Sequence, residues 1–511
     1  MRCSSCGTIN DDGAVFCGSC GAAVGRQDQD QTIAFPKHSV DGFDRGQRVT
    51  SDATRYLCAA VQLDSVLAER VIREIVDEEY KAPPLSPDVD LVQVLSHALA
   101  ARGRQLLRDV ALTMVLIVLL VLIATRVGLL LTAIIGVLFA WLIITVEQII
   151  TTYGIVARDL GPGRATPAAP PPSGSWAAHR LNEIGRSSGG NVTVYGSYSP
   201  FVGSGRPIEA WSFALDIERA AEGHVVEAFA VQDIHDYVLA RMSRLGLAGV
   251  AVDERVFVDG RDLRGDGRFL PNELSPPVSR VGKALVDALT AAPEDRARTY
   301  MCLRVTGWRG QLVLSTFLRF VVTGNNLFVE VSHSLLTPIL ERYQEVDRLL
   351  PQPTFRQFIR IARHSFRLVL RGLFGAPLAV GRAALAPISR SRRRARQRRE
   401  ITTALRFNYG STISPREVAS DPRVQRYFQE LDKSLYSKIV EKRLLEAIVT
   451  FLDDRGIDTG DLVARQTTIL NQGVYVGGRA TINAQSVAGG LGARAIARFT
   501  KTRTTAAQGA E

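Results

Sequence analysis

The sequence lacks most of the features from which a function can be read directly. Only six cysteines occur in 511 residues, and a chain of this length can bury cores of its own, which excludes a small disulfide-stapled fold. We find no phosphate-binding loop, paired-histidine zinc-protease motif, G-x-S-x-G elbow or Rossmann fingerprint. The sequence therefore favours a non-catalytic protein, with an enzyme of unrecognised type in residues 176–353 as an open alternative.

Acidic residues are scarce in one arginine-rich segment, and the excess of arginines over acids in that segment accounts for the positive net charge of the whole chain. The net charge is +11. Residues 354–400 contain thirteen arginines and one acid, so this segment carries +12 and the rest of the chain carries −1 (11 minus 12). A cationic segment of this density predicts an anionic partner.

Charge is almost missing from residues 110–146, where Arg126 is the single charged residue. One helix of this length would rise about 55 Å, nearly twice the ~30 Å hydrocarbon core of a bilayer. The sequence therefore predicts a transmembrane hairpin of two helices that reverses near Arg126, where the arginine can reach the far interface. The small residues Thr132, Gly136 and Ala140 predict the contact between the two arms.

Arginines flank the base of this hairpin and are nearly absent from its tip. Because cytoplasmic flanks are enriched in arginine and lysine, we expect a two-pass protein of the bacterial inner (cytoplasmic) membrane with both termini in the cytoplasm. Residues 56–109 should form a helical juxtamembrane region, whose last part runs straight into the first arm. The flanking residues are Arg102, Arg104, Arg108, Arg158 and Arg164.

Four of the six cysteines form two C-x-x-C pairs, each followed by glycine. This spacing turns two thiolates toward one ion, and two such pairs complete a tetrahedral zinc site that would supply most of the folding energy of so short a segment. The segments CSSCG and CGSCG resemble the paired knuckles of the zinc-ribbon family, which implies a structural or interaction module with bound Zn²⁺. The predicted ligands are Cys3, Cys6, Cys17 and Cys20, whereas Cys58 and Cys302 are expected to be buried free thiols.

Residues 176–353 have the pattern of an α+β domain with a mainly antiparallel sheet. Helical periodicity is found at 233–245, 278–289 and 336–350. The last three predicted strands follow one another closely, as in a meander. The predicted strands are 191–195, 210–217, 249–258, 299–305, 311–322 and 327–332.

Two groups of residues in this domain could suggest a site. Asp233, His235 and Asp236 resemble an acid-base or metal cluster, but acids at a helix start are ordinarily capping residues, and this is our interpretation. The loop 196–207 combines apolar residues with glycines and serines. We expect an ordinary turn there, with a ligand or partner loop as the alternative.

Arginines recur every three or four residues between 355 and 374, so they follow one face of an amphipathic helix that should end near Gly372 and Pro377. A second cluster of arginines follows at 390–399. Because a hairpin already holds the chain at a membrane, we expect this segment to contact anionic lipid. The predicted lipid- or nucleic-acid-binding residues are Arg356, Arg360, Arg363, Arg367, Arg371, Arg392, Arg393, Arg394, Arg396, Arg398 and Arg399.

Two alternatives to lipid contact are open for this segment. Nucleic acid would also accept a run of arginines, and a zinc ribbon in the same chain is compatible with that reading, but no recognition helix or stacking aromatic set accompanies the run. The arginines could also pair with the protein's own acidic residues.

The C-terminal part is expected to be a helical module followed by a Gly/Asn-rich, β-prone tail. The module has an S-x-x-E start at Ser414 and regular apolar spacing, which is typical of an assembly unit. The tail has short alternating segments with little charge, so it is either a flexible tail or a strand that self-associates. We therefore expect a protein partner or a homo-oligomer formed through the module and tail.

Together these features resemble zinc-ribbon membrane proteins of high-GC Gram-positive bacteria. That resemblance rests on the knuckles and implies no mechanism. The expected role is a membrane-anchored scaffold or sensor facing the cytoplasm. The predicted parts are a zinc ribbon (1–25), a tether (26–55), a helical region (56–109), the hairpin (110–146), a Pro-rich linker (161–175), an α+β domain (176–353), a basic segment (354–400), a helical module (401–465) and a tail (466–511).

Overall fold

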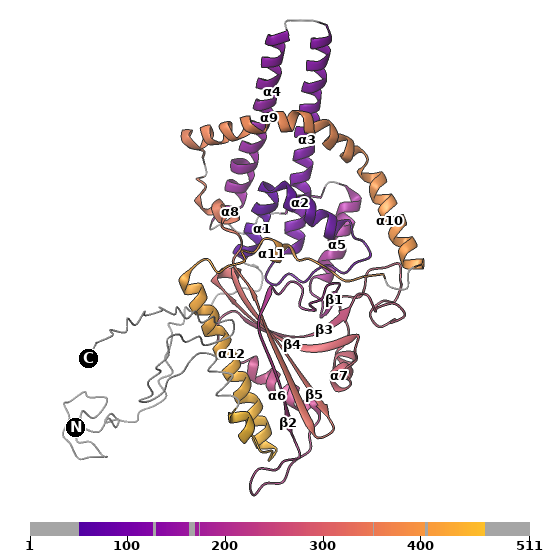
Figure 1. Ribbon diagram of the computed structural model, residues 1–511, viewed down its shortest axis with the longest axis vertical. Helices are drawn as coiled ribbons and strands as arrows, with labels where there is room; N and C mark the ends of the chain where they lie inside the picture. Colours follow the sequence, from indigo (N-terminus) through magenta and orange to yellow (C-terminus); the bar gives the residue numbers. More distant parts are fainter. Residues whose placement is uncertain are drawn as a thin grey trace, which may run out of the picture. The chain divides into compact units, whose positions relative to one another are not determined.

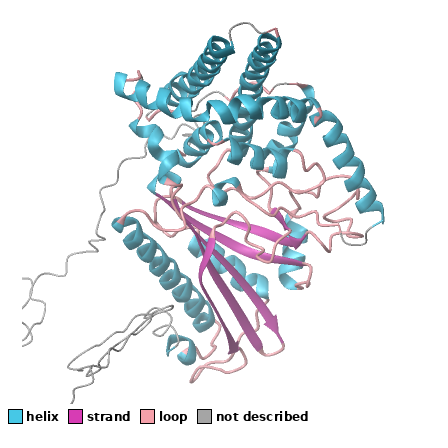
Figure 2. Ribbon diagram, turned by 45° about the horizontal axis from the view of Figure 1, so that its top comes forward, coloured by secondary structure: helices cyan, strands magenta, loops and turns pink. Residues whose placement is uncertain are grey.

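The computed structural model of the chain contains a β-sheet, a layer of helices beside it and two long helices that project from that layer (Figures 1 and 2). The predicted zinc ribbon, the tip of the hairpin at Arg126 and the tail lie outside the residues that the structure describes. The described residues are 51–125, 129–162, 169–172, 174–350, 352–403 and 407–464.

Six strands form one sheet in the order β1-β3-β4-β5-β6-β2. β1 pairs with β3 in parallel and every other neighbouring pair is antiparallel, so the predicted α+β architecture is confirmed with a mixed sheet. Each predicted strand coincides with an observed one. The strands are β1 Val192–Tyr195, β2 Arg206–Asp216, β3 Val250–Asp259, β4 Ala297–Gly307, β5 Leu312–Thr323 and β6 Asn326–Leu336.

The helix predicted over 336–350 is wrong in its first part. β6 continues to Leu336, which pairs with Val313 of β5, and only a short helix α8 (Glu341–Gln344) follows. Backbone pairing in the sheet outweighs the helical spacing of the apolar residues here. Pro338 also disfavours helical backbone at the residue that precedes it.

Two helices from distant parts of the sequence complete the main core of the sheet. They are α6 (Val231–Met242) and α12 (Tyr427–Asp454), and α12 runs alongside the sheet in Figure 1. A smaller core lies under α7 (Lys283–Ala291), next to β3 and β4. To the main core α6 and α12 contribute Ile234, Val238, Val440, Leu444 and Ile448, each no more than 1% exposed.

A buried polar pair also joins α12 to the sheet. Nε2 of His333 on β6 lies 3.2 Å from a carboxylate oxygen of Glu441 on α12, and His333 Nδ1 is 2.9 Å from the hydroxyl of Thr316 on β5. All three side chains are buried. The core therefore runs across the boundary that we expected between the α+β domain and the C-terminal helical module.

The helical layer contains α1 (Asp52–Leu63), α2 (Ser65–Val71), α5 (Ser175–Ser187) and the first part of α3 (Leu91–Ala124). A π-helical turn continues α2 to Val76. These helices occupy much of the region expected to be helical before the hairpin, and the first of them starts at Asp52, inside the expected tether. The layer has its own core, which includes Leu57, Ile72, Leu95 and Ile184.

α3 and α4 (Leu129–Ile149, continued by a π-helix to Ala157) are the two described helices long and apolar enough to cross a membrane. Both expose apolar side chains along the predicted hairpin, for example Met114, Leu130 and Phe139 at 56–76% exposure. α3 runs continuously from the helical layer into the hairpin, as predicted. A Cβ atom on Gly136 would lie 3.0 Å from Leu119, so the arms contact each other at the predicted small residue.

The arginine segment forms α9 (Phe355–Ala384) and α10 (Ala386–Thr403), which bend by 51° at their junction. The predicted end of the first helix near Pro377 is wrong, because α9 continues through that proline. Proline removes one backbone hydrogen bond, whereas Leu373 and Ala376 beside it are buried against the hairpin and hold the helix in place. A one-turn helix, α11 (Pro415–Val418), precedes α12.

Candidate membrane-contact surface

α9 lies across both arms of the hairpin, as Figures 1 and 2 show. Trp141 Nε1 on α4 donates to the carbonyl of Ala362 on α9 over 2.8 Å, and Ser365 Oγ is 3.0 Å from Gln148 Oε1. These polar contacts fix the height at which α9 crosses α4. The apolar contact joins Leu112 of α3, Ala140 and Ile144 of α4, and Val369, Leu373 and Ala376 of α9.

A second face of α9 is apolar but exposed. Phe355, Phe366, Leu370 and Phe374 are 58–76% exposed. Phe366, Leu370 and Phe374 follow one another at intervals of four residues and therefore form a row along the helix. We call these four residues the apolar row. A row of exposed large apolar side chains on a soluble protein would mark a contact with another molecule.

The five predicted arginines of α9 form a second exposed row. Around the helix, the apolar row lies between these arginines and the face that is buried against the hairpin. Arg356, Arg360, Arg363 and Arg367, with Ile359 and His364, line a cavity of about 400 Å³. None of the five makes an ion pair or hydrogen bond to a residue that the structure describes. We call Arg356, Arg360, Arg363, Arg367 and Arg371 the arginine row.

The arginines of α10 behave differently, because several bind the chain's own residues. Arg393 is 3.5 Å from a carboxylate oxygen of Glu78, Arg394 pairs with Glu79, and Arg398 donates to the Tyr80 hydroxyl over 2.9 Å. Burial alone would raise the pKa of Glu79, but its bonds with Arg394 and Trp176 outweigh burial and lower that pKa. These contacts match the alternative in which the arginines pair with the protein's own acids.

The other predicted arginines of α10 are Arg392, Arg396 and Arg399. Arg396 pairs with Glu400 one turn away at 2.8 Å. Arg392 and Arg399 have no ion pair with a described residue. Within α10, an anionic partner could therefore reach only part of the predicted set.

The loop 196–207 is fixed by packing. The Phe201 ring stacks on Phe317 with 3.8 Å between ring centroids, and the backbone N–H groups of Gly203 and Gly205 donate to Glu417. These contacts favour the packed turn over a ligand loop.

The predicted capping role is confirmed for Asp233 and is wrong for its neighbours. Asp233 accepts a hydrogen bond from the backbone N–H of Ala230 over 2.8 Å, at the start of α6. His235 is instead 3% exposed and lies, with Asp236, beside Glu254 of β3. No sequence motif links residues 235 and 254, because the fold alone brings that helix and strand together.

Comparison with protein families gives two matches. A zinc-ribbon domain model matches residues 2–24, and an AbeC-like domain model matches residues 210–483. The chain belongs to the AbeC-like family. Neither a curated protein nor a solved structure matches it.

The AbeC-like region begins in β2 and extends beyond α12. It includes the sheet from β2 onward, both arginine helices and the helix that completes the sheet core. The hairpin precedes it, so the contact between α9 and the hairpin joins the AbeC-like region to the two candidate membrane-spanning helices. The zinc-ribbon match confirms the predicted N-terminal ribbon, and its four cysteines lie outside the residues that the structure describes.

Proposed function

We propose that this AbeC-like protein is a membrane-anchored scaffold whose helix α9 lies along an anionic, cytoplasmic lipid leaflet. The observation that carries the proposal is the position of α9, which crosses the hairpin with the apolar row and the arginine row both exposed. The arginine row has no ion pair to a described residue. A helix with these two faces beside membrane-spanning helices suits the interface between headgroups and acyl chains. The scaffold would hold the zinc ribbon and the AbeC-like sheet at that surface for a protein partner.

Energy arguments favour an interfacial position over a crossing by α9. By length and composition, α9 and α10 together could form a third, bent span. Arginines in a bilayer centre cost several kcal/mol each, whereas each contributes about 1 kcal/mol near an anionic surface. Burial of the exposed phenylalanines in the acyl boundary adds roughly 1.5–3 kcal/mol each. The apolar row and the arginine row of α9 are therefore both stabilised most at the membrane–water interface, where the first can contact acyl chains and the second can contact headgroups.

We propose a two-pass topology with both termini in the cytoplasm, for which the flanking arginines argue. The hairpin is short for this task. From Leu112, where α9 crosses, α3 rises about 18 Å to Ala124, compared with a hydrocarbon core of ~30 Å. Arg126 would have to extend its side chain to the far headgroups, or the bilayer would have to thin locally.

Topology can be tested with Arg126→Cys and a membrane-impermeant maleimide added outside sealed, right-side-out vesicles. Labelling of the tip supports two crossings, and labelling only after the vesicles are opened contradicts them. The native cysteines do not interfere, because Cys58 and Cys302 are buried and the ribbon cysteines would be on the inner side.

Lipid contact can be tested by titrating the detergent-solubilised full chain with phosphatidylglycerol or phosphatidylcholine and counting bound lipids by native mass spectrometry. The triple variant Arg360→Gln, Arg363→Gln, Arg367→Gln removes three charges worth about 1 kcal/mol each. We expect phosphatidylglycerol binding to weaken by roughly 100-fold, with little change for phosphatidylcholine.

The matched control removes the same charge from exposed arginines elsewhere, as Arg186→Gln, Arg244→Gln, Arg296→Gln. This control should bind phosphatidylglycerol like the wild type. Equal weakening in both triple variants would mean that net charge, and not the arginine row, governs binding. A nucleic-acid partner would be favoured instead if the wild type shows no preference for phosphatidylglycerol but binds a DNA duplex tightly and in a salt-sensitive way, and if the α9 triple variant loses that DNA binding.

A further inference from the structure

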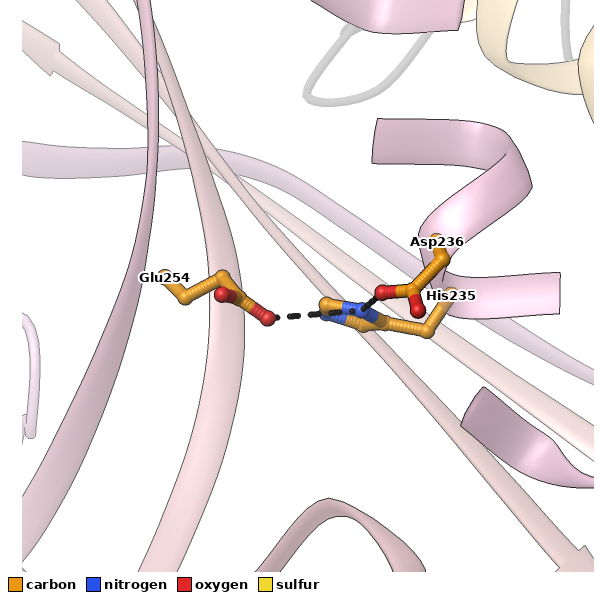
Figure 3. A group of neighbouring side chains, drawn as sticks. All are labelled: His235, Asp236 and Glu254. Carbon is orange, nitrogen blue, oxygen red and sulfur yellow. Dashed lines mark hydrogen bonds and ion pairs between the residues drawn. The ribbon is translucent and has the colours of Figure 1, made fainter. Parts of the chain in front are cut away.

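A buried histidine lies between two carboxylates where α6 meets β3. His235 Nδ1 is 3.4 Å from Asp236 Oδ1 and 3.5 Å from Glu254 Oε1 (Figure 3). The histidine is 3% exposed, although it has an ionisable ring, and it belongs neither to the membrane surface nor to the zinc ribbon. One nitrogen and two carboxylate oxygens are thus close together.

The spacing of these atoms suits a transition-metal ion. Ligands about 2.0–2.1 Å from zinc at tetrahedral angles are separated by about 3.4 Å, which agrees with both nitrogen–oxygen distances. The three ligand atoms all lie within 4.8 Å of one another. An imidazole with two carboxylates is a donor set for zinc and related divalent ions rather than for magnesium or calcium, which prefer oxygen ligands alone.

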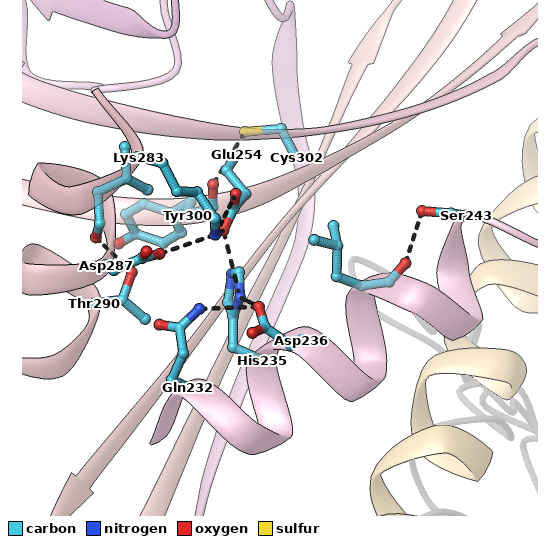
Figure 4. Close-up of polar contacts among 12 residues, drawn as sticks. Gln232, His235, Asp236, Ser243, Glu254, Lys283, Asp287, Thr290, Tyr300 and Cys302 are labelled. Atoms are coloured by element: carbon cyan, nitrogen blue, oxygen red, sulfur yellow. Dashed lines mark hydrogen bonds and ion pairs between the residues drawn. The ribbon is translucent and has the colours of Figure 1, made fainter. Parts of the chain in front are cut away.

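The charge around the histidine is also suitable. Lys283 lies between Glu254 and Asp287, at 3.1 Å from the first and 2.9 Å from the second (Figure 4). The three carboxylates of Asp236, Glu254 and Asp287 and this one ammonium give −2 (−3 plus 1). A divalent cation would neutralise the group, and Lys283 could keep its contact with Asp287 while Glu254 turns to the ion.

Neighbouring groups supply support and access. Gln232 donates to Asp236 Oδ1 over 2.9 Å, so it holds this carboxylate in place. The Asp236 side chain is 56% exposed, which gives an ion a path from solvent.

We propose that His235, Asp236 and Glu254 form a second metal site, separate from the zinc ribbon, that binds a divalent transition-metal ion. The ion would join the middle of α6 to the middle of β3. Zinc is the probe for this site, and cobalt is its spectroscopic substitute.

The experiment measures bound metal on the full chain in detergent after dialysis against buffers of fixed micromolar free zinc. We expect two equivalents for the wild type, and one for each of the variants Glu254→Gln and Asp236→Asn. The control Asp262→Asn changes an exposed carboxylate outside this group, and it should keep two equivalents. The variant Cys17→Ser, Cys20→Ser should keep one.

Cobalt distinguishes the two sites directly. The ribbon should give intense thiolate charge-transfer absorption, whereas the second site should give only weak visible bands. These weak bands must persist in the cysteine variant. In Glu254→Gln the affinity of the second site for cobalt should fall by more than about 100-fold. Because Asp236 is largely exposed, Asp236→Asn should fold normally even if Glu254→Gln does not. The proposal is overturned if the cysteine variant binds no zinc, or if adding Asp236→Asn to the cysteine variant leaves its zinc binding unchanged.

Discussion

Substitution of Arg416 by methionine should destabilise the protein strongly, because this side chain is a buried connector. Arg416 lies on α11 and is fully buried. Its Nη2 donates to the carbonyls of Gln311 and Thr337 over 2.9 Å each and to that of Gly310 over 3.3 Å. These carbonyls belong to residues just before β5 and just after β6, so the guanidinium ties the ends of two strands to α11.

The expected size follows from these bonds. Each buried carbonyl left without a donor costs about 1–3 kcal/mol, while removal of a buried charge returns part of that cost. Burial lowers the pKa of Arg416 to about 10, so the group is still charged at neutral pH. We expect a net loss of about 3 kcal/mol for Arg416→Met, and a Tm lower by roughly 3–6 °C, because the entropy of unfolding grows with the number of residues that unfold together.

The assay is thermal unfolding of the full chain in detergent, followed by intrinsic fluorescence. Arg416→Lys keeps the charge but loses the planar donor geometry and should fall between methionine and the wild type. The control Arg423→Met removes an exposed arginine nearby and should change stability by no more than about 0.5 kcal/mol. If Arg416→Met melts within 2 °C of the wild type, the reasoning is refuted.

Three other predictions concern buried groups and close packing. Burial raises the pKa of Glu417, so the ionised carboxylate destabilises the folded state at neutral pH. Glu417→Gln should therefore raise the Tm at pH 7.5, and this gain should vanish below about pH 4.5, where the carboxyl is protonated in both states; an equal gain at both pH values would contradict this prediction. Burial also raises the pKa of the Cys58 and Cys302 thiols, so mass spectrometry should find both unmodified by iodoacetamide until the chain is denatured. Gly372→Leu should destabilise the α9 contact by about 1–3 kcal/mol, because an added Cβ would lie only 3.0 Å from Ile144 of the hairpin, whereas Gly375→Leu has open space and should not; equal effects on Tm would refute this packing argument.

The sequence predicted those elements that depend on local pattern. The strands follow alternation and β-branched runs, and α3 and α4 follow long apolar runs. The contact at Gly136 follows from residue size. In each case the relevant signal lies within one segment of the chain, where periodicity and composition are sufficient.

Features that depend on distant residues could not be predicted in this way. α12 looks like an independent module until its apolar face is seen against β5 and β6, and residues 394 and 398 look free until the fold brings residues 78–80 to them. The pairing of His235 with Glu254 is of the same kind. Such contacts depend on how elements meet in three dimensions, and one sequence carries no record of that.

The return of α12 to the sheet sets an order of events during protein synthesis. The ribosome completes β6 at Leu336 and must then translate both arginine helices before α12 ends at Asp454. At 5–20 residues per second this interval lasts roughly 6–24 s. Throughout it the part of the apolar face that α12 will cover is exposed, while the hairpin, made earlier, can already be in the bilayer. Insertion would thus keep the half-built sheet tethered and apart from other nascent chains until its last helix emerges.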